Sequence, residues 1–246
     1  MFRSSKGPRH RVEETIVRAK LSEIVKELNK QIGENLVGVL LTGSLARKEF
    51  SEIGSNVNSW VVLKSDSPSS IMAIKKLYGK YIEQRIVQPV VTTKGEIEGM
   101  KESFPLLLHE ARKFHELLAG ENFLNSLEVP EENLKSHARR EILTQPILLR
   151  RRFLEISERK QVVFPLLNLV TRTCLFNTKC ALYLREAELY SREELIKRAA
   201  SLSDKASVLS GLYAYKYAGR GVNLTDAIQM ILKGIDYLSD LVAHAK

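Results

Sequence analysis

Apolar residues in the first third of the chain follow helical spacing in some stretches and form short continuous runs in others. A helix is predicted before Gly33, because apolar residues recur every three or four positions up to that glycine. This stripe consists of Val17, Leu21, Ile24, Val25, Leu28 and Ile32. The same spacing predicts a second helix over residues 71–84. Runs at residues 36–42, 57–63 and 86–92 predict buried strands, the last with Pro89 at a position that needs no ladder N–H.

From Lys94 onward the strand signals stop, and helical spacing continues. The predicted helical stretches are 95–118, 131–157, 161–187, 191–202, 204–218 and 223–244. Pro146 and Pro165 are expected to kink or break two of them. The pattern therefore predicts an α/β (or α+β) domain over residues 12–125 and an all-helical bundle over residues 126–246, preceded by a flexible basic tail at residues 1–11.

Charge is distributed unevenly along the chain. Of the 38 Lys and Arg residues, four lie in residues 1–11 and 19 lie in residues 131–246, which contain only 13 acidic residues. A polyanion, such as a nucleic acid or a nucleotide phosphate, is thus a reasonable partner, although a solvated basic surface fits the same numbers. The net charge of the whole chain is +9.

Several other classes of protein are disfavoured by the composition. No apolar stretch approaches the roughly 18 residues that a membrane span requires. The cysteines, Cys174 and Cys180, lie about 9 Å apart on one predicted helix, too far for a disulfide, which fits the cytoplasm. His109 and His115 lie on different faces of their helix, and no Cys/His set has zinc spacing. We therefore expect no metal site of that kind.

The most informative segment is a Gly-Ser turn between two of the predicted strands. Gly43 and Ser44 follow the apolar run 36–42 and open a short helix that contains Arg47. Backbone N–H groups at such a turn, together with the serine hydroxyl, are suited to holding a phosphate. Gly43, Ser44 and Arg47 are therefore the candidate phosphate-binding residues.

The order Gly43-Ser44-x-Ala46-Arg47-x-Glu49, followed by a strand at residues 58–63, resembles the nucleotidyltransferase superfamily of the DNA polymerase β type. The resemblance covers about residues 12–100. It implies a small mixed sheet with flanking helices, followed by a helical domain. It also implies an Asp-x-Asp pair at the second strand, which binds the divalent ions that bridge the nucleotide triphosphate.

This chain departs from the family at the acidic positions. Asn56 and Asn58 stand where the resemblance places the aspartates, and Gln88 stands where a third carboxylate is expected on a later strand. Neutral amides supply no charge to hold Mg²⁺. We therefore expect no bound metal or other cofactor, and a protein that has lost nucleotidyl transfer while still binding a nucleotide, RNA or a protein partner.

Two alternatives remain open. In the first, the asparagines are engineered or compensated, and the protein is an active transferase that uses Mg²⁺ to move a nucleoside monophosphate to an acceptor. In the second, the protein is a structural interaction scaffold. A basic cluster is the candidate nucleic-acid surface, although a solvated helix face fits it as well. Its members are Arg139, Arg140, Arg150, Arg151 and Arg152. The sequence leaves the acceptor, the preferred nucleotide and the oligomeric state open.

Overall fold

The computed structural model describes residues 11–87 and 89–245. The chain divides into a sheet-containing unit that ends at Asn133 and a helical unit that begins at Leu134. Of the predicted basic tail, only Arg11 falls within the described residues, and its guanidinium Nε donates a hydrogen bond to the Glu52 carboxylate. The rest of that tail lies outside them.

A sheet of 4 strands, in the order β3-β2-β1-β4, forms the centre of the first unit. Strand β1 (Leu36–Thr42) runs antiparallel to both β2 (Asn58–Leu63) and β4 (Glu116–Gly120). Strand β3 (Val90–Thr93) runs parallel to β2. The sheet is thus mixed, as the sequence predicts, and its central strands β1 and β2 are almost entirely buried.

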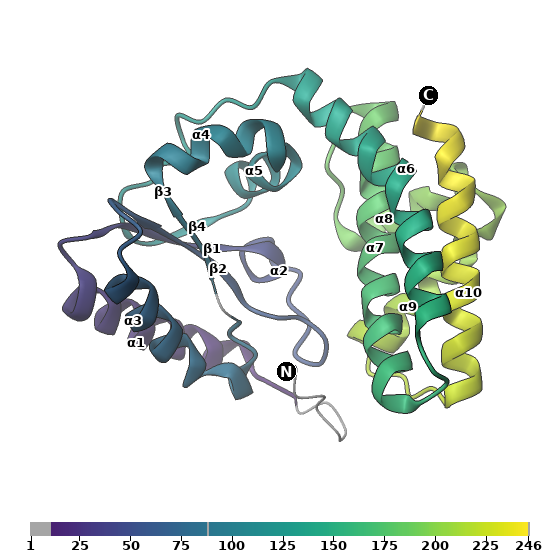
Figure 1. Ribbon diagram of the computed structural model, residues 1–246, viewed down its shortest axis with the longest axis horizontal. Helices are drawn as coiled ribbons and strands as arrows, with labels where there is room; N and C mark the ends of the chain where they lie inside the picture. The colour runs from purple at the N-terminus through teal and green to yellow at the C-terminus, as the bar shows by residue number, and fades with distance from the viewer. Residues whose placement is uncertain (1–10, 88, 246) are drawn as a thin grey trace. The chain divides into compact units, whose positions relative to one another are not determined.

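Helices cover both faces of this sheet (Figure 1). On one face, α1 (Glu14–Ile32) and α3 (Pro68–Gly79) pack over a core that includes Val39 and Val61. On the other face, Leu40 and Trp60 pack with residues of α4 (Lys94–Ser103) and α5 (Pro105–Lys113). Alternate residues of β2 therefore point to opposite layers.

Two of the sequence predictions for this unit are wrong. Residues 95–118 do not form one helix, because Pro105 begins a new helix after Phe104 and the chain then enters β4. The strand was missed because Leu117, Leu118 and Ala119 are good helix formers, so pairing with β1 overrides their local preference. The third strand is shorter than predicted and begins at Val90, after Pro89, which leaves Pro89 outside the ladder.

The helical unit is built mainly from α6 (Glu131–Glu155), α7 (Lys160–Glu186), α8 (Arg192–Arg198), α9 (Val208–Tyr217) and α10 (Leu224–Leu241). Short 3-10 turns flank them at Ala199–Ser201, Asp204–Ser207 and Val242–Ala245, as one does in the first unit at Ile82–Gln84. Pro146 and Pro165 lie inside α6 and α7, and neither proline ends its helix. The prolines therefore do not break these helices, and a kink at either one stays a prediction.

Close contact between α7 and α10 forms the centre of the helical unit. Gly234 of α10 lies against α7 so closely that a Cβ added there would be 2.6 Å from the Val170 Cγ1. One turn further along α10, the Tyr237 hydroxyl lies 2.7 Å from the Thr178 hydroxyl. Both residues of this polar pair are buried. Glycine at position 234 thus allows the two helices to approach.

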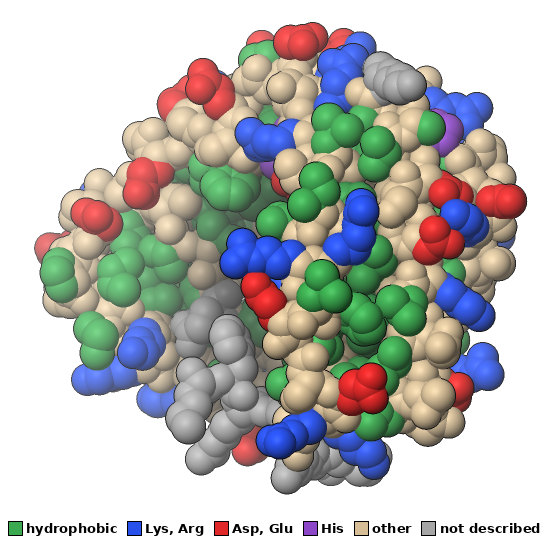
Figure 2. Space-filling model, turned by 45° about the vertical axis from the view of Figure 1, so that its right-hand side comes forward, with side chains coloured by type: hydrophobic (Ala, Val, Ile, Leu, Met, Phe, Trp, Pro, Cys, Tyr) green, Lys and Arg blue, Asp and Glu red, His purple; other side chains and the backbone are tan. Residues whose placement is uncertain are grey.

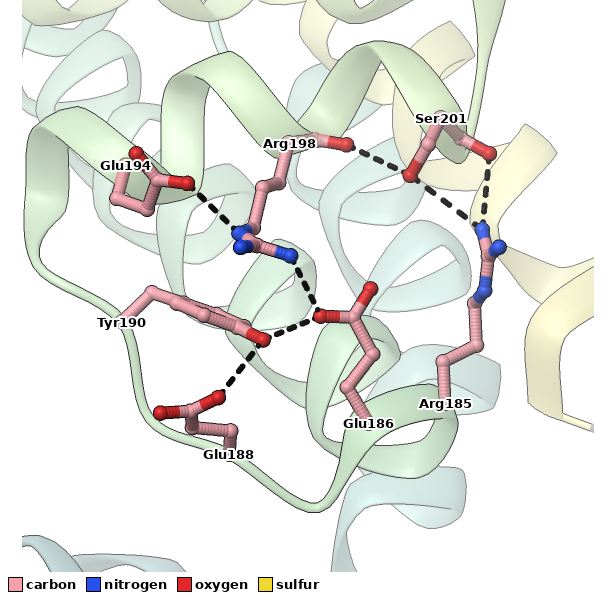
Figure 3. A network of polar contacts seen from close by, with 7 residues as sticks. All are labelled: Arg185, Glu186, Glu188, Tyr190, Glu194, Arg198 and Ser201. Carbon is pink, nitrogen blue, oxygen red and sulfur yellow. Dashed lines mark hydrogen bonds and ion pairs between the residues drawn. The ribbon is translucent and has the colours of Figure 1, made fainter.

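A polar network closes the corner between α7 and α8 (Figure 3). The Tyr190 hydroxyl donates to the carboxylates of Glu186 and Glu188, and the Arg198 guanidinium lies 4.2 Å from the centre of the Tyr190 ring. Arg198 also forms ion pairs with Glu186, at 2.9 Å, and with Glu194, at 2.8 Å. The hydrogen bond to Glu186 raises the pKa of Tyr190 to about 12. These contacts orient α8 on the end of α7.

Candidate phosphate site at the end of the first strand

The Gly-Ser turn lies where β1 ends and the 4-residue helix α2 (Gly43–Ala46) begins. Gly43 has a backbone φ of +74°, a left-handed conformation that residues with a Cβ rarely adopt. Its carbonyl accepts a hydrogen bond from the Arg47 N–H at 3.0 Å, which closes the first turn of the helix. Ser44 follows and is buried. The turn thus requires glycine for its backbone shape.

Asn58 lies beside this turn. It pairs with Thr42 in the register of β1 and β2, which brings the starting end of β2 next to Gly43. A Cβ added to Gly43 would lie only 2.8 Å from the Asn58 Nδ2. Asn56 and Asn58 are both exposed, and the intervening Val57 is buried in the core under α1 and α3. The structure therefore brings together Gly43 and Asn58, which sequence reasoning assigned to one site.

These residues do not fit a magnesium site. Mg²⁺ binds anionic oxygens such as carboxylates and phosphates, whereas Asn56 and Asn58 offer only neutral amide groups. Within residues 11–87 and 89–245, no group of three or more Asp, Glu, His or Cys side chains is placed to hold an ion. Gln88, the third position singled out in the sequence, lies outside the described residues. We therefore assign no chemical step to a metal in this structure.

Arg47 has a different environment from the one that the sequence suggests. Its guanidinium is bound by the carboxylates of Glu49, at 2.9 Å, and Glu110 of α5, and its side chain is only 12% exposed. Two acidic partners neutralise its charge and fix its direction. Arg47 thus ties α2 to α5, while its use in phosphate binding stays a prediction. Glu110 was missed because it lies far from the motif in sequence and on a helix of ordinary pattern.

Buried polar pairs hold β2, the strand that begins at Asn58. On the α1 and α3 face, the Ser59 hydroxyl lies 2.8 Å from the hydroxyl of Tyr78, whose pKa is raised to about 12 by burial. On the opposite face, the Trp60 indole Nε1 donates to the Thr92 hydroxyl at 2.7 Å and so links β2 to β3. The start of β2 is thus fixed from both sides of the sheet.

The predicted nucleic-acid residues all lie on α6, in the helical unit. Arg140 contacts the His137 Nδ1 at 2.8 Å, Arg150 donates to the Pro146 carbonyl at 3.1 Å, and Arg151 pairs with Glu155 at 2.8 Å. The side chains of Arg140, Arg150, Arg151 and Arg152 are exposed, whereas Arg139 is partly buried. Nucleic-acid binding by this cluster stays a prediction.

The tyrosines that alternate in the sequence separate once α9 forms. Tyr215 is buried and stacks on Phe164, with ring centres 6.4 Å apart. Tyr213 and Tyr217 share another face, where the Arg192 guanidinium lies 4.0 Å from the centre of the Tyr217 ring. Helical geometry therefore accounts for the spacing, with core and surface tyrosines on different faces.

Comparison with solved structures identifies the class of fold. The spectinomycin adenyltransferase AAD(9) from Enterococcus faecialis, solved with ATP and spectinomycin, aligns with a TM-score of 0.63 over 92% of this chain and 99% of that chain, at 12% sequence identity. The fold is therefore that of a nucleotidyltransferase with a helical C-terminal part. A protein from Sulfolobus solfataricus assigned as a nucleotidyltransferase aligns over 35% of this chain and 77% of that one, with 23% identity and a TM-score of 0.28.

No protein-family model and no curated protein matches the sequence. Among the described residues, no helix combines the length and the apolar character needed to cross a membrane. Cys174 and Cys180 are both buried on α7, and neither forms a disulfide. Burial raises the pKa of the Cys174 thiol, so it remains protonated and packs as an apolar side chain.

Proposed function

We propose that this protein uses the nucleotidyltransferase fold to bind the phosphate of a nucleotide at Gly43–Ser44 and has lost metal-dependent transfer. The observation that carries the proposal is the contact between Gly43 and Asn58. The neutral amide of Asn58 lies 2.8 Å from where a Cβ on Gly43 would be, beside the turn that receives phosphate in the family. The turn has the glycine that its backbone conformation needs, whereas the asparagines beside it carry no negative charge to bind a metal ion.

The backbone of the turn needs no metal to attract an anion. N–H groups at a tight turn and a serine hydroxyl both donate hydrogen bonds to phosphate oxygens. Replacing aspartates by asparagines also removes negative charge that repels phosphate when no ion is bound. Nucleotide binding that is independent of Mg²⁺ is therefore the behaviour that distinguishes this protein from a working transferase.

Calorimetric titration with ATP, with Mg²⁺ and with EDTA, tests this proposal. We expect saturable ATP binding of equal affinity in both conditions. In the Asn56→Asp, Asn58→Asp variant we expect ATP binding to become dependent on Mg²⁺, because two carboxylates then gather the ion and repel the bare phosphate. Absence of ATP binding in the parent protein contradicts the proposal and favours an interaction scaffold.

An active transferase is the second candidate, and the alignment with an adenyltransferase over 92% of the chain favours it. Its test is release of pyrophosphate from ATP and Mg²⁺ in the presence of hydroxyl acceptors, including spectinomycin. Turnover by the unaltered chain that disappears in the Asn58→Ala variant would show that the amide side chains support catalysis. It would also overturn the proposed loss of transfer.

A further inference from the structure

Helix α6 carries apolar residues on more than one side. Its buried side packs into the helical unit through Leu134, Ala138, Ile142 and Leu149. On another side, Leu143, Ile147 and Leu154 are 45%, 63% and 83% exposed. A surface helix of a globular unit normally has one apolar stripe, facing its own core. The exposed row is therefore not explained by the packing of α6 within its unit.

The exposed row has a regular spacing and a basic character. Arg140, Leu143, Ile147, Arg150 and Leu154 are separated alternately by three and four residues, and we call this row the α6 seam. Such spacing places all five on one line along a helix, as in the contact line of paired helices. Residues 134–155 contain six Lys or Arg and only two Glu. The seam thus combines aliphatic side chains with positive charge.

Apolar and basic side chains are interspersed on one face of the protein. Figure 2 shows hydrophobic side chains lying among Lys and Arg side chains on the face that it displays. Arg151 lies beside the seam and pairs with Glu155, whereas Arg150 donates to the carbonyl of Pro146 on its own helix. Each guanidinium keeps further N–H groups for an outside acceptor, because arginine has five.

We propose that the α6 seam is a docking site for an amphipathic helix of a partner protein, with acidic residues facing the arginines. Aliphatic residues on the partner would cover Leu143, Ile147 and Leu154, and its carboxylates would meet Arg140 and Arg150. Charge complementarity selects this occupant: the seam is basic, and carboxylates bind guanidinium groups with good geometry. All five residues of the seam belong to the helical unit.

A nucleic acid fits the same surface less well. Single strands bind proteins by stacking bases on aromatic side chains, and the seam has none. A phosphate backbone would also leave the three aliphatic side chains without an apolar partner. A lipid surface is normally entered through a broader apolar face that includes aromatic residues. The seam, by contrast, has the width and the spacing of one helix packed on another.

The seam also limits the length of its partner. Residues 140–154 span about 21 Å at the rise of an α-helix. A partner helix of about four turns therefore covers the seam. Because its charge contacts are solvent-exposed, we expect the affinity to fall as salt is raised.

The test uses the full chain and a labelled helical peptide of about 15 residues, with leucines at seam spacing and glutamates opposite Arg140 and Arg150. Fluorescence anisotropy should show saturable binding that weakens with salt. The Ile147→Glu, Leu154→Glu variant should weaken binding at least about tenfold, and Arg150→Glu should weaken it at low salt. Leu232→Glu, at a site 41% exposed on α10, is the matched control and should bind as the parent does.

Circular dichroism melts establish that each variant is folded, which is expected because the changed side chains are exposed. Failure of the peptide to bind, or equal binding to the Ile147→Glu, Leu154→Glu variant, overturns the proposal. Single-stranded RNA and vesicles rich in anionic lipid are tested in parallel. If either binds through the seam while the peptide does not, the seam belongs to that partner and the proposal is wrong.

Discussion

Gly234 and Gly43 are two of the glycines at which an added Cβ would meet a close neighbour, and they differ in what occupies that space. Gly234 of α10 faces the buried Val170 and Cys174 of α7, so its missing Cβ serves the packing of two helices. Gly43 faces the exposed Asn58 and has a φ of +74°. The first glycine lets two helices pack in an apolar interior, whereas the second shapes the turn at the candidate phosphate site. Substituting Gly234 should therefore lower stability alone, whereas substituting Gly43 should also lower nucleotide affinity.

The largest effect is expected at the helix contact. Gly234→Val would place a Cβ 2.6 Å from the Val170 Cγ1, inside the packed contact of α7 and α10. We expect the free energy of unfolding to fall by about 3 kcal/mol, at the upper end for overpacked cores. Denaturation in urea measures this change.

The control for Gly234→Val is Gly211→Ala, at a helical glycine that has room for a side chain. Alanine is used there because valine is a poorer helix former. At Gly211 the nearest atom to an added Cβ is the flexible Met230 Cε at 3.9 Å. We expect Gly211→Ala to raise the free energy of unfolding by up to about 1 kcal/mol through helix propensity. Equal destabilisation by both substitutions would show that α7 and α10 do not meet as described.

Gly43→Val is expected to have the next largest effect. Valine at a φ of +74° is strained, and its side chain meets the Asn58 amide, so we expect a loss of stability of about 2 kcal/mol. Nucleotide affinity should fall at least about tenfold, because the side chain blocks the approach of a phosphate to the backbone. Calorimetry at a temperature where the variant is folded separates the two effects.

A result at Gly43 that resembles the one at Gly234 would remove the distinction between the two glycines. If Gly43→Val loses stability but binds ATP as the parent does, the turn is only structural. The Gly234→Val protein, while folded, should retain the ATP affinity of the parent, which makes it the control for general damage.

Thr178→Val tests whether the helix contact also depends on its buried polar pair. The substitution removes the partner of the Tyr237 hydroxyl, at 2.7 Å, without changing the shape of the side chain. We expect a loss of about 1.5 kcal/mol, because a buried hydroxyl is left without its hydrogen bond. Adding Tyr237→Phe should recover part of the loss. If the double variant is no more stable than Thr178→Val, the hydroxyl has found another partner.

Elements whose pattern lies within their own segment could be predicted from the sequence, and elements that depend on distant partners could not. The stripe in α1 and the runs that form β1 and β2 were evident, because burial on one face or on both leaves a periodic trace. Strand β4 was not evident, because its Glu116–Gly120 sequence favours helix and its pairing partner is β1, far along the chain. The continuity of α6 through Pro146 likewise depends on the rest of the unit.

The candidate site shows the same division. Gly43 and Asn58 lie side by side, as the sequence suggested, because the turn and the next strand are neighbours in sequence. That Gly43 and Ser44 bind a phosphate stays a prediction. The partner of Arg47, Glu110, comes from a helix that sequence spacing could not bring near. The α6 seam is regular in the sequence, but only the structure shows that the helix buries its other side. Contacts between distant segments are thus what the residues alone did not reveal.

The smallest effect separates two serines of the sheet-containing unit. Ser44 opens α2 at the candidate site, and Ser59 pairs with the buried Tyr78 hydroxyl at 2.8 Å. If Ser44 donates one neutral hydrogen bond to a phosphate, Ser44→Ala should weaken ATP binding by about 1 kcal/mol, or about fivefold, and should leave stability nearly unchanged. Ser59→Ala should do the reverse, because it leaves the Tyr78 hydroxyl buried without that partner. Paired calorimetry and urea denaturation of both variants decide the matter. Equal ATP affinity in the parent and in Ser44→Ala would restrict any phosphate binding to the backbone of the turn, and Gly43 would then account for the site without its neighbour.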